Sequence, residues 1–448
     1  MDVSRRTALV VGGTSGIGLG LAHRLARLGS TVVVGGRRPA PVDGLEQVQV
    51  DVTDPASVLR ARDEVLAAHP DLDLAPTTAG VLTVRGCGRY FVRARDRSLK
   101  ESGLHPTERS SMLGFDPDRF STVVGGAVRL RPRIEELAEL VVDRDPNALF
   151  LIGSGGSHAA MWPYALLMST RSTLLTRTPI AAELVVSGDR HLTAESVVVL
   201  ASLSGTTKET VAAAEYCRER GVTTIGMTGD PESPLARIVD HVLVNPADDE
   251  TASESYDIQL TLLMTAILAR RGEFDGYPRL AAAVDRSEEI LLAIQQQAEP
   301  VAAAFAERHR DTGYHMLVGA GNLWGFAYNY SMCILEEMQW LHTTRVHGAE
   351  FFHGSLELVE KDTSLMLFVG EDESRPLMER VRRFAETYSD QVTVLDSADY
   401  PLEGVDADLR GLFAPLVMDS ITIRISKHLE QVRNHPLDTR RYYRVVEY

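Results

Sequence analysis

The stretch ALFLIGSGGSH (residues 148–158) decides the fold, because a short apolar run passes through a turn rich in glycine and serine into a helical pattern. The stretch YHMLVGAGNL (residues 314–323) repeats this design, and a helical pattern follows it as far as residue 341. Two copies of strand, glycine-rich turn and helix predict two α/β domains of similar architecture.

The surrounding pattern supports parallel sheets. Further strands are predicted at residues 196–201, 223–227, 241–244, 364–369 and 391–395. Helical patterns alternate with these strands, as parallel α/β architecture requires. The predicted boundaries are 125–285 for the first of these domains and 286–448 for the second.

The N-terminal segment has a third glycine turn, between a strand at Thr7 to Val11 and a helix from Leu19. Gly12, Gly16 and Gly18 are candidate cofactor contacts, because a side chain at these positions would keep a pyrophosphate from the backbone. This segment resembles the short-chain dehydrogenase/reductase family over residues 1–80 and predicts a partial Rossmann fold. Residues 81–124 lack a sustained apolar period and are predicted to be a linker.

Hydride transfer is not expected of this segment. Catalysis in the family it resembles needs a tyrosine with a lysine four residues later, and none of the 13 tyrosines has one. A truncated segment is the favoured interpretation, and a bifunctional reductase remains an alternative.

Composition limits the class of protein and its partners. The chain has 448 residues, 44% of them hydrophobic and 24% charged, which is ordinary for a globular protein of two or three domains. Its formal net charge of −16 disfavours nucleic acid. Three cysteines far apart predict neither a disulfide framework nor a metal site. We expect a cytoplasmic protein with no membrane span.

A second turn carries a concentration of hydroxyl groups. Residues 202–209 read SLSGTTKE, between a predicted strand and a predicted helix. Hydroxyls and free N–H groups at a helix N-terminus can bind an anion, although serine and threonine there also serve as simple N-caps. A phosphate site in a net-acidic chain would have to rely on such local donors rather than on a broadly positive surface.

Glu337 and His353 are the candidate acid/base residues. On a helix, Glu337 would face Cys333, Ile334, Trp340 and Leu341, so we expect a desolvated carboxyl with a raised pKa. The alternative is a carboxylate at a helix rim beside Glu336. His353 precedes a glycine in a predicted turn, and imidazole transfers protons near neutral pH.

Residues 116–448 resemble sugar isomerase (SIS) domain enzymes in the two turns and in the spacing of Glu337 to His353. The resemblance implies that Ser202, Ser204 and Thr207 hold a sugar phosphate, and that Gly156 and Ser157 line the sugar. It implies ring opening by His353, in some relatives from the neighbouring subunit, and proton transfer between C1 and C2 by Glu337. Further candidate substrate contacts are Gly155, Glu350 and the tail residue Arg441.

Within this family, EMQWLH (337–342), GEDESR (370–375) and the tail NHPLDTRRYY (434–443) resemble the fructosamine 6-phosphate deglycases. The resemblance implies cleavage of a 6-phosphorylated Amadori compound by a homodimer or larger homo-oligomer, with no cofactor. Aldose/ketose or amino-sugar phosphate isomerisation is the nearest alternative. A non-catalytic sugar-phosphate regulator is an alternative of another class.

Overall fold

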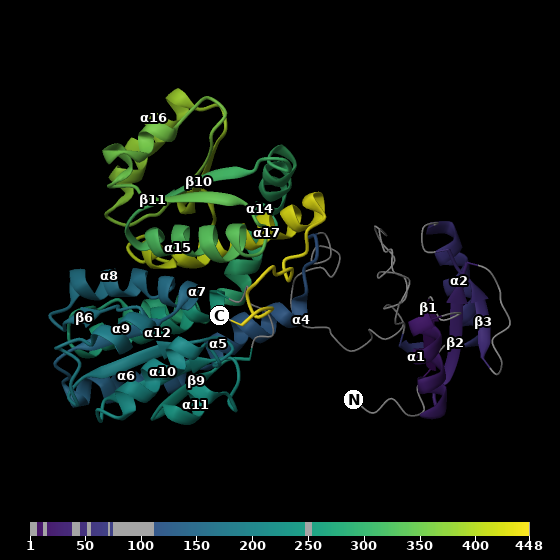
Figure 1. Ribbon diagram of the computed structural model, residues 1–448, viewed down its shortest axis with the longest axis horizontal. Helices are drawn as coiled ribbons and strands as arrows, with labels where there is room; N and C mark the ends of the chain where they lie inside the picture. The colour runs from purple at the N-terminus through teal and green to yellow at the C-terminus, as the bar shows by residue number, and fades with distance from the viewer. Residues whose placement is uncertain are drawn as a thin grey trace. The chain divides into compact units, whose positions relative to one another are not determined.

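The computed structural model describes residues 7–11, 16–37, 45–51, 55–69, 72–74, 112–246 and 253–447. The chain divides into two compact units, residues 1–104 and 105–448. Figure 1 shows the elements of each unit, and the colour follows the chain from purple to yellow.

The first unit contains a four-stranded parallel sheet in the order β3-β2-β1-β4. This order, with a glycine-rich sequence between β1 and α1, is that of one half of a dinucleotide-binding fold. Its elements are β1 (Thr7–Val11), α1 (Gly16–Arg27), β2 (Thr31–Gly36), β3 (Glu46–Gln49), α2 (Pro55–Ala68) and β4 (Leu72–Leu74).

The second unit contains two separate parallel sheets, with strand orders β6-β5-β7-β8-β9 and β11-β10-β12-β13. The prediction of α/β architecture with two similar domains is confirmed by these sheets. Elements of the first sheet region are α4 (Pro117–Phe120), η1 (Ser121–Gly125), α5 (Gly126–Arg129), α6 (Arg131–Arg144), β5 (Leu149–Gly153), α7 (Gly155–Ala159), α8 (Trp162–Arg171), β6 (Thr176–Arg177), α9 (Ala181–Ser187), β7 (Val197–Ala201), α10 (Lys208–Arg218), β8 (Thr223–Thr228), α11 (Pro234–Ile238), β9 (His241–Val244), α12 (Ser253–Arg270) and α13 (Tyr277–Val284).

The second sheet region follows a long helix. Its elements are α14 (Ser287–Arg308), β10 (Tyr314–Gly319), η2 (Gly321–Leu323), α15 (Trp324–Asn329), η3 (Tyr330–Glu336), β11 (His342–His347), η4 (Phe351–His353), η5 (Ser355–Leu358), β12 (Ser364–Val369), α16 (Arg375–Tyr388), β13 (Val392–Asp396), η6 (Ser397–Asp399) and α17 (Arg410–Arg433). Figure 1 shows α15 and α17 between the two sheets.

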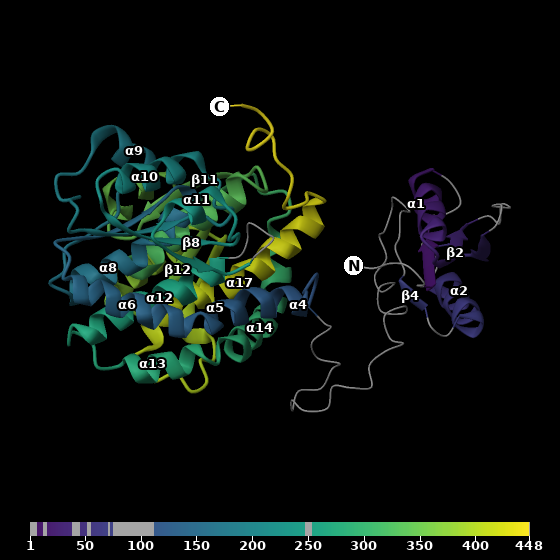
Figure 2. The same ribbon diagram turned by 90° about the horizontal axis from the view of Figure 1, so that it is seen from below.

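Alternate residues of the central strands face opposite helical layers. Leu149 and Leu151 of β5 pack in the cluster that includes α6 and α12, whereas Phe150 and Ile152 pack against α9 and α10. Figure 2 shows the same arrangement, with α9, α10 and α11 on one side of β8 and α6 and α12 on the other. A strand that is buried on both faces is therefore continuously apolar.

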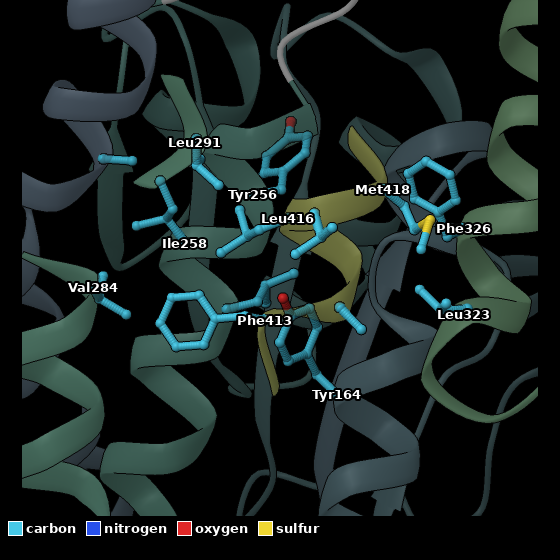
Figure 3. Packing of buried hydrophobic residues seen from close by; sticks show 14 of the residues in the cluster. Tyr164, Tyr256, Ile258, Val284, Leu291, Leu323, Phe326, Phe413, Leu416 and Met418 are labelled. Carbon is cyan, nitrogen blue, oxygen red and sulfur yellow. The ribbon is translucent and has the colours of Figure 1, made fainter. Parts of the chain in front are cut away.

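One hydrophobic core joins the two sheet regions of this unit. Tyr164 of α8, Ile258 of α12, Phe326 of α15 and Phe413 of α17 belong to the same buried cluster, and Figure 3 shows them packed together. Met112 and Phe120, which precede residue 125, belong to it too. The domain boundaries at residues 80, 124 and 285 remain predictions.

The helix predicted as far as residue 341 ends earlier. The α-helical part, α15, passes into the π-helical turn η3, which ends at Glu336. Trp340 then adopts a φ of 55°, which a right-handed helix does not allow. The edge strand β11 follows, and its mostly half-exposed polar residues do not show the apolar pattern that predicts strands.

Two buried carboxyl groups face each other inside the second unit. Asp257 of α12 and Asp419 of α17 are 4% and 7% exposed. Burial raises the pKa of Asp257 to about 6, and burial together with the charge of Asp257 raises the pKa of Asp419 well above its ordinary value.

Among the helices of the described ranges, none is long and apolar enough to cross a membrane.

Candidate active site

The glycine-rich turn after β5, residues 153–157, is the first turn of the site, and it lies against the second sheet region. Gly155 and Gly156 begin α7 directly after β5. A Cβ atom at Gly156 would lie 2.7 Å from Asn329 Oδ1 and 3.3 Å from Cys333 Sγ. Only glycine allows this approach, which places the turn beside the helical segment that leads to Glu337.

Ser157, the last residue of this turn, is half-buried. Burial raises the pKa of the Tyr256 phenol in the first turn of α12, and the nearby Ser157 side chain offsets part of that rise. Ser157 therefore lies where the turn meets the first residues of α12.

The hydroxyl-rich turn, residues 202–207, connects β7 to α10. Ser202 Oγ lies 2.9 Å from Thr207 Oγ1, and Ser204 Oγ lies 2.9 Å from Thr206 Oγ1. Thr207 is the N-cap residue of α10, yet its side chain makes no capping hydrogen bond. Its hydroxyl is directed toward Ser202 instead, so the simple N-cap interpretation does not account for it.

Gly205 gives this turn its shape. Its φ is 62°, and a Cβ atom there would lie 2.1 Å from Ser233 Oγ and 2.8 Å from Thr228 Oγ1. Both the left-handed backbone and the lack of space require glycine.

The two turns meet at the start of α10. Ser154 Oγ, in the first turn, lies 3.4 Å from Thr210 Oγ1, in the first helical turn of α10. The N-terminus of this 11-residue helix adds free N–H groups to the hydroxyls of Ser202, Ser204 and Thr207. The combination suits an anionic group such as a phosphate.

Glu337 lies directly after η3, and its backbone N–H donates to Met332 O at 3.1 Å. Its side chain is 28% exposed, and its Oε1 atom lies 3.0 Å from Nε of Arg440. The expectation of an apolar surrounding is therefore wrong: the carboxylate faces a guanidinium, which also holds it in place.

His353 and Glu350 lie elsewhere in the same subunit. Both are exposed, and His353 N donates to Glu350 O at 2.9 Å. They follow the C-terminal end of β11, whereas Glu337 precedes its N-terminal end. The six residues of β11, which span about 20 Å, therefore lie between Glu337 and His353 in the chain.

The C-terminal tail, residues 434–447, approaches both parts of this region. The Arg441 guanidinium lies 4.1 Å from the centre of the Trp340 ring and does not contact Glu337. The preceding residue, Arg440, makes that contact, and Arg444 donates from Nη2 to Ser204 Oγ at 3.1 Å. The arginine-rich string RRYYR at 440–444 is the sequence signal for both residues.

The three glycines predicted to bind a cofactor lie in the first unit. Gly12 is outside the described residues, and Gly16 and Gly18 belong to the first turn of α1. Their proposed role in nucleotide binding remains a prediction.

Two family models match different parts of the chain. The SIS domain family matches residues 144–269, and the short chain dehydrogenase family matches residues 6–97. The fructosamine deglycase FrlB of Bacillus subtilis is 34% identical over 309 residues, which cover 67% of this chain and 92% of that protein. The fructoselysine 6-phosphate deglycase of Escherichia coli K12 is 26% identical and is covered to 92%.

Solved structures agree with this assignment. A Bacillus subtilis protein described as a phosphosugar isomerase has a TM-score of 0.64 at 33% identity, with 68% of this chain and 93% of that chain covered. A Salmonella typhimurium protein of the same description has a TM-score of 0.66 at 30% identity, with 71% and 97% covered.

Proposed function

Because this chain belongs to the SIS-domain family of sugar-phosphate deglycases and phosphosugar isomerases, we propose that it cleaves fructosamine 6-phosphates with water. The products are an aldose 6-phosphate and a free amine or amino acid. The observation that carries the proposal is the 34% identity to a fructosamine deglycase over 92% of its length. The tail string and the residues around Glu337, which resemble the deglycases, support the same branch.

The substrate phosphate binds at the hydroxyl-rich turn. Ser202, Ser204 and Thr207 donate hydroxyl hydrogen bonds to it, and the N-terminus of α10 adds N–H donors and a favourable dipole. Gly155, Gly156 and Ser157 line the sugar, because the first turn meets the start of α10.

The reaction begins with ring opening, for which His353 transfers a proton between the hydroxyl and the ring oxygen. Glu337 then removes a proton from C1 of the open-chain ketosamine, and a proton is returned at C2. In this step the C2 carbonyl oxygen takes a proton to give an enaminol. Its C1–C2 π pair then binds the proton at C2 while the nitrogen lone pair forms the C1–N double bond and the N–H proton leaves, so C1 becomes an imine carbon. Water adds to this carbon, the C–N bond breaks, and the amine leaves. Arg440 positions the Glu337 carboxylate through their 3.0 Å ion pair.

A second subunit completes the site. Glu337 and His353 of one chain flank opposite ends of β11, which supports a site shared between two chains. A homodimer or larger homo-oligomer would place His353 of the partner subunit, together with its neighbour Glu350, opposite Glu337. This arrangement accounts for the exposure of both residues in the single chain.

Release of free amine tests the proposal. The purified protein is incubated with 6-phosphorylated fructosamines of several amino acids, and amine is measured against the Glu337→Gln variant. Amine released by the wild type and lost in the variant supports the deglycase. Interconversion of fructose 6-phosphate with an aldose phosphate, without amine release, indicates an isomerase. Binding without turnover, unchanged by the variant, indicates a regulator.

For residues 1–80 the favoured interpretation is a truncated dinucleotide-binding segment without hydride transfer. Gly12, Gly16 and Gly18 would carry whatever nucleotide affinity it retains. Titration of NAD and NADP into the full chain, followed by fluorescence, tests this, and the absence of binding at millimolar concentration removes the nucleotide role.

A further inference from the structure

The C-terminal tail is fixed beside the turn that carries Glu337. Asn434 ends α17 in a left-handed conformation, with a φ of 49°. The fully buried Gln339 donates from Nε2 to His435 O at 2.8 Å, and the His435 ring lies 4.5 Å from the Trp340 ring, edge to face. The yellow segment after α17 in Figure 1 is this tail. It is therefore a built part of the fold rather than a frayed end.

Beyond this anchor, the tail places two guanidinium groups four residues apart. Arg440 pairs with Glu337, and Arg444 reaches the hydroxyl-rich turn through Ser204. Tyr443 lies near both, at 6.0 Å from the Arg440 guanidinium and 5.0 Å from that of Arg444. Arg444 has a φ of 56°, a conformation that costs free energy in a residue with a side chain. Residues with such a backbone conformation cluster at active sites and ligand contacts.

The contact with Ser204 leaves that hydroxyl able to bind an anion. Ser204 Oγ accepts hydrogen bonds from Arg444 Nη2 and from Thr206 N. With both acceptor positions occupied, Ser204 directs its own proton to Thr206 Oγ1, 2.9 Å away. A phosphate that takes this proton in place of Thr206 lies within reach of the guanidinium as well. Arginine matches phosphate oxygens with a planar fork of donors.

The charge of the chain makes this guanidinium significant. A phosphate monoester carries nearly two negative charges at neutral pH, and the formal charge of the chain is −16. The hydroxyls of Ser202, Ser204 and Thr207 are neutral donors. A cation at the edge of the turn offsets the repulsion between the phosphate and the negatively charged chain, which neutral hydroxyls cannot offset. The sequence expectation that local neutral donors alone hold the phosphate is incomplete in this respect.

We infer that Arg444 binds the substrate phosphate and determines the preference for phosphorylated over unphosphorylated sugars. This inference rests on the proposed function, since it takes the turn at 202–207 to be the phosphate site. It also assigns one role to the whole tail: the segment that positions Glu337 through Arg440 delivers the phosphate-binding cation through Arg444.

The test compares four variants of the full-length protein: Arg444→Met, Arg444→Lys, Ser204→Ala and Arg237→Met. Arg237 is a matched control, because it is an exposed arginine of the same unit that pairs with Glu232 on the surface. Binding of inorganic phosphate is measured by calorimetric titration, and KM and kcat are measured by amine release.

We expect Arg444→Met to weaken phosphate binding by roughly tenfold to a hundredfold, the range for a hydrogen bond to a charged group. KM should rise by a similar factor with kcat near the wild-type value, because the phosphate is remote from the reacting carbons. Arg444→Lys should recover part of the loss, since it keeps the charge but not the fork. Arg237→Met should behave as the wild type.

Two outcomes overturn the inference, one through Arg444 alone and the other through the phosphate turn. If Ser204→Ala weakens phosphate binding while Arg444→Met leaves it unchanged, the phosphate site stands and the role of Arg444 is wrong. If the wild type binds no phosphate, or Ser204→Ala changes nothing, the assignment of the turn fails and the inference with it, whereas the proposed function fails only if the wild type releases no amine.

Discussion

The shared active site makes a quantitative prediction about mixed oligomers. Glu337→Gln removes the proposed enolisation base, and His353→Ala removes the proposed ring-opening group. Each group is expected to contribute about 10²- to 10⁴-fold to the rate. Each variant alone should therefore keep no more than about 1% of the wild-type rate of amine release.

The activity that mixed oligomers should regain follows from how Glu337 and His353 are distributed between the subunits. A proton donor must lie within about 3 Å of the reacting atom, and in the proposed shared site each sugar is contacted by Glu337 of one subunit and His353 of the other. In randomly mixed oligomers of the two variants, half of the carboxylates and half of the imidazoles are intact. About one quarter of the sites then contain both, so about one quarter of the wild-type activity should return.

The assay uses co-expression of the two variants with different affinity tags, and the mixed oligomer is isolated through both tags in succession. A heterodimer selected in this way has one intact and one doubly altered site, so about half of the wild-type activity is expected per dimer. Co-expression of two differently tagged copies of the same variant is the control. A chain that carries both substitutions, co-expressed with the wild type and isolated in the same way, should give an inactive heterodimer.

The opposite pattern would refute the reasoning. If the two residues acted within one subunit, the mixed single variants would stay inactive, and the doubly substituted chain paired with the wild type would keep half of the activity. Monomeric protein with full activity, shown by light scattering, would end the proposal of a shared site.

Three further predictions concern single side chains. Arg440→Met should lower kcat more than it raises KM, because the ion pair holds the Glu337 carboxylate but does not touch the phosphate turn; equal pH–rate profiles and kcat values for variant and wild type would contradict this. Gly205→Ala should destabilise the protein by about 2 kcal/mol in urea unfolding, because the Cβ meets two buried hydroxyls, whereas Gly272→Ala, with φ 73° and open space, should cost less. Asp419→Asn should raise stability relative to the wild type at neutral and higher pH, because the raised pKa of this buried carboxyl means that the folded state binds more protons and loses stability as pH rises; thermal unfolding from pH 5 to 8 should show a flatter profile in the variant, and an unchanged slope would count against the buried pair.

The sequence alone determined the α/β architecture, because strand, glycine turn and helix are local patterns set by apolar periodicity and by positions that admit only glycine. It also located the turn at 202–207, since hydroxyls before a helix are a local signal. It did not predict the end of the helix before Glu337 or the edge strand β11. Trp340 gives no local sign of its left-handed backbone, and β11 is polar because it is exposed on one side.

Only the tertiary structure decided how these parts combine. It brought Arg440 to Glu337 and Arg444 to Ser204, which is 240 residues away in the chain, and it placed the strand β11 between Glu337 and His353, whose numbers differ by only 16. The physical reason is that the strength of an ion pair, and whether one side chain can contact another, depend on distance in space. Sequence spacing predicts that distance only within one regular helix or strand. Here the strand β11 lies between Glu337 and His353, and the folded C-terminal tail contacts residues that are distant in the chain.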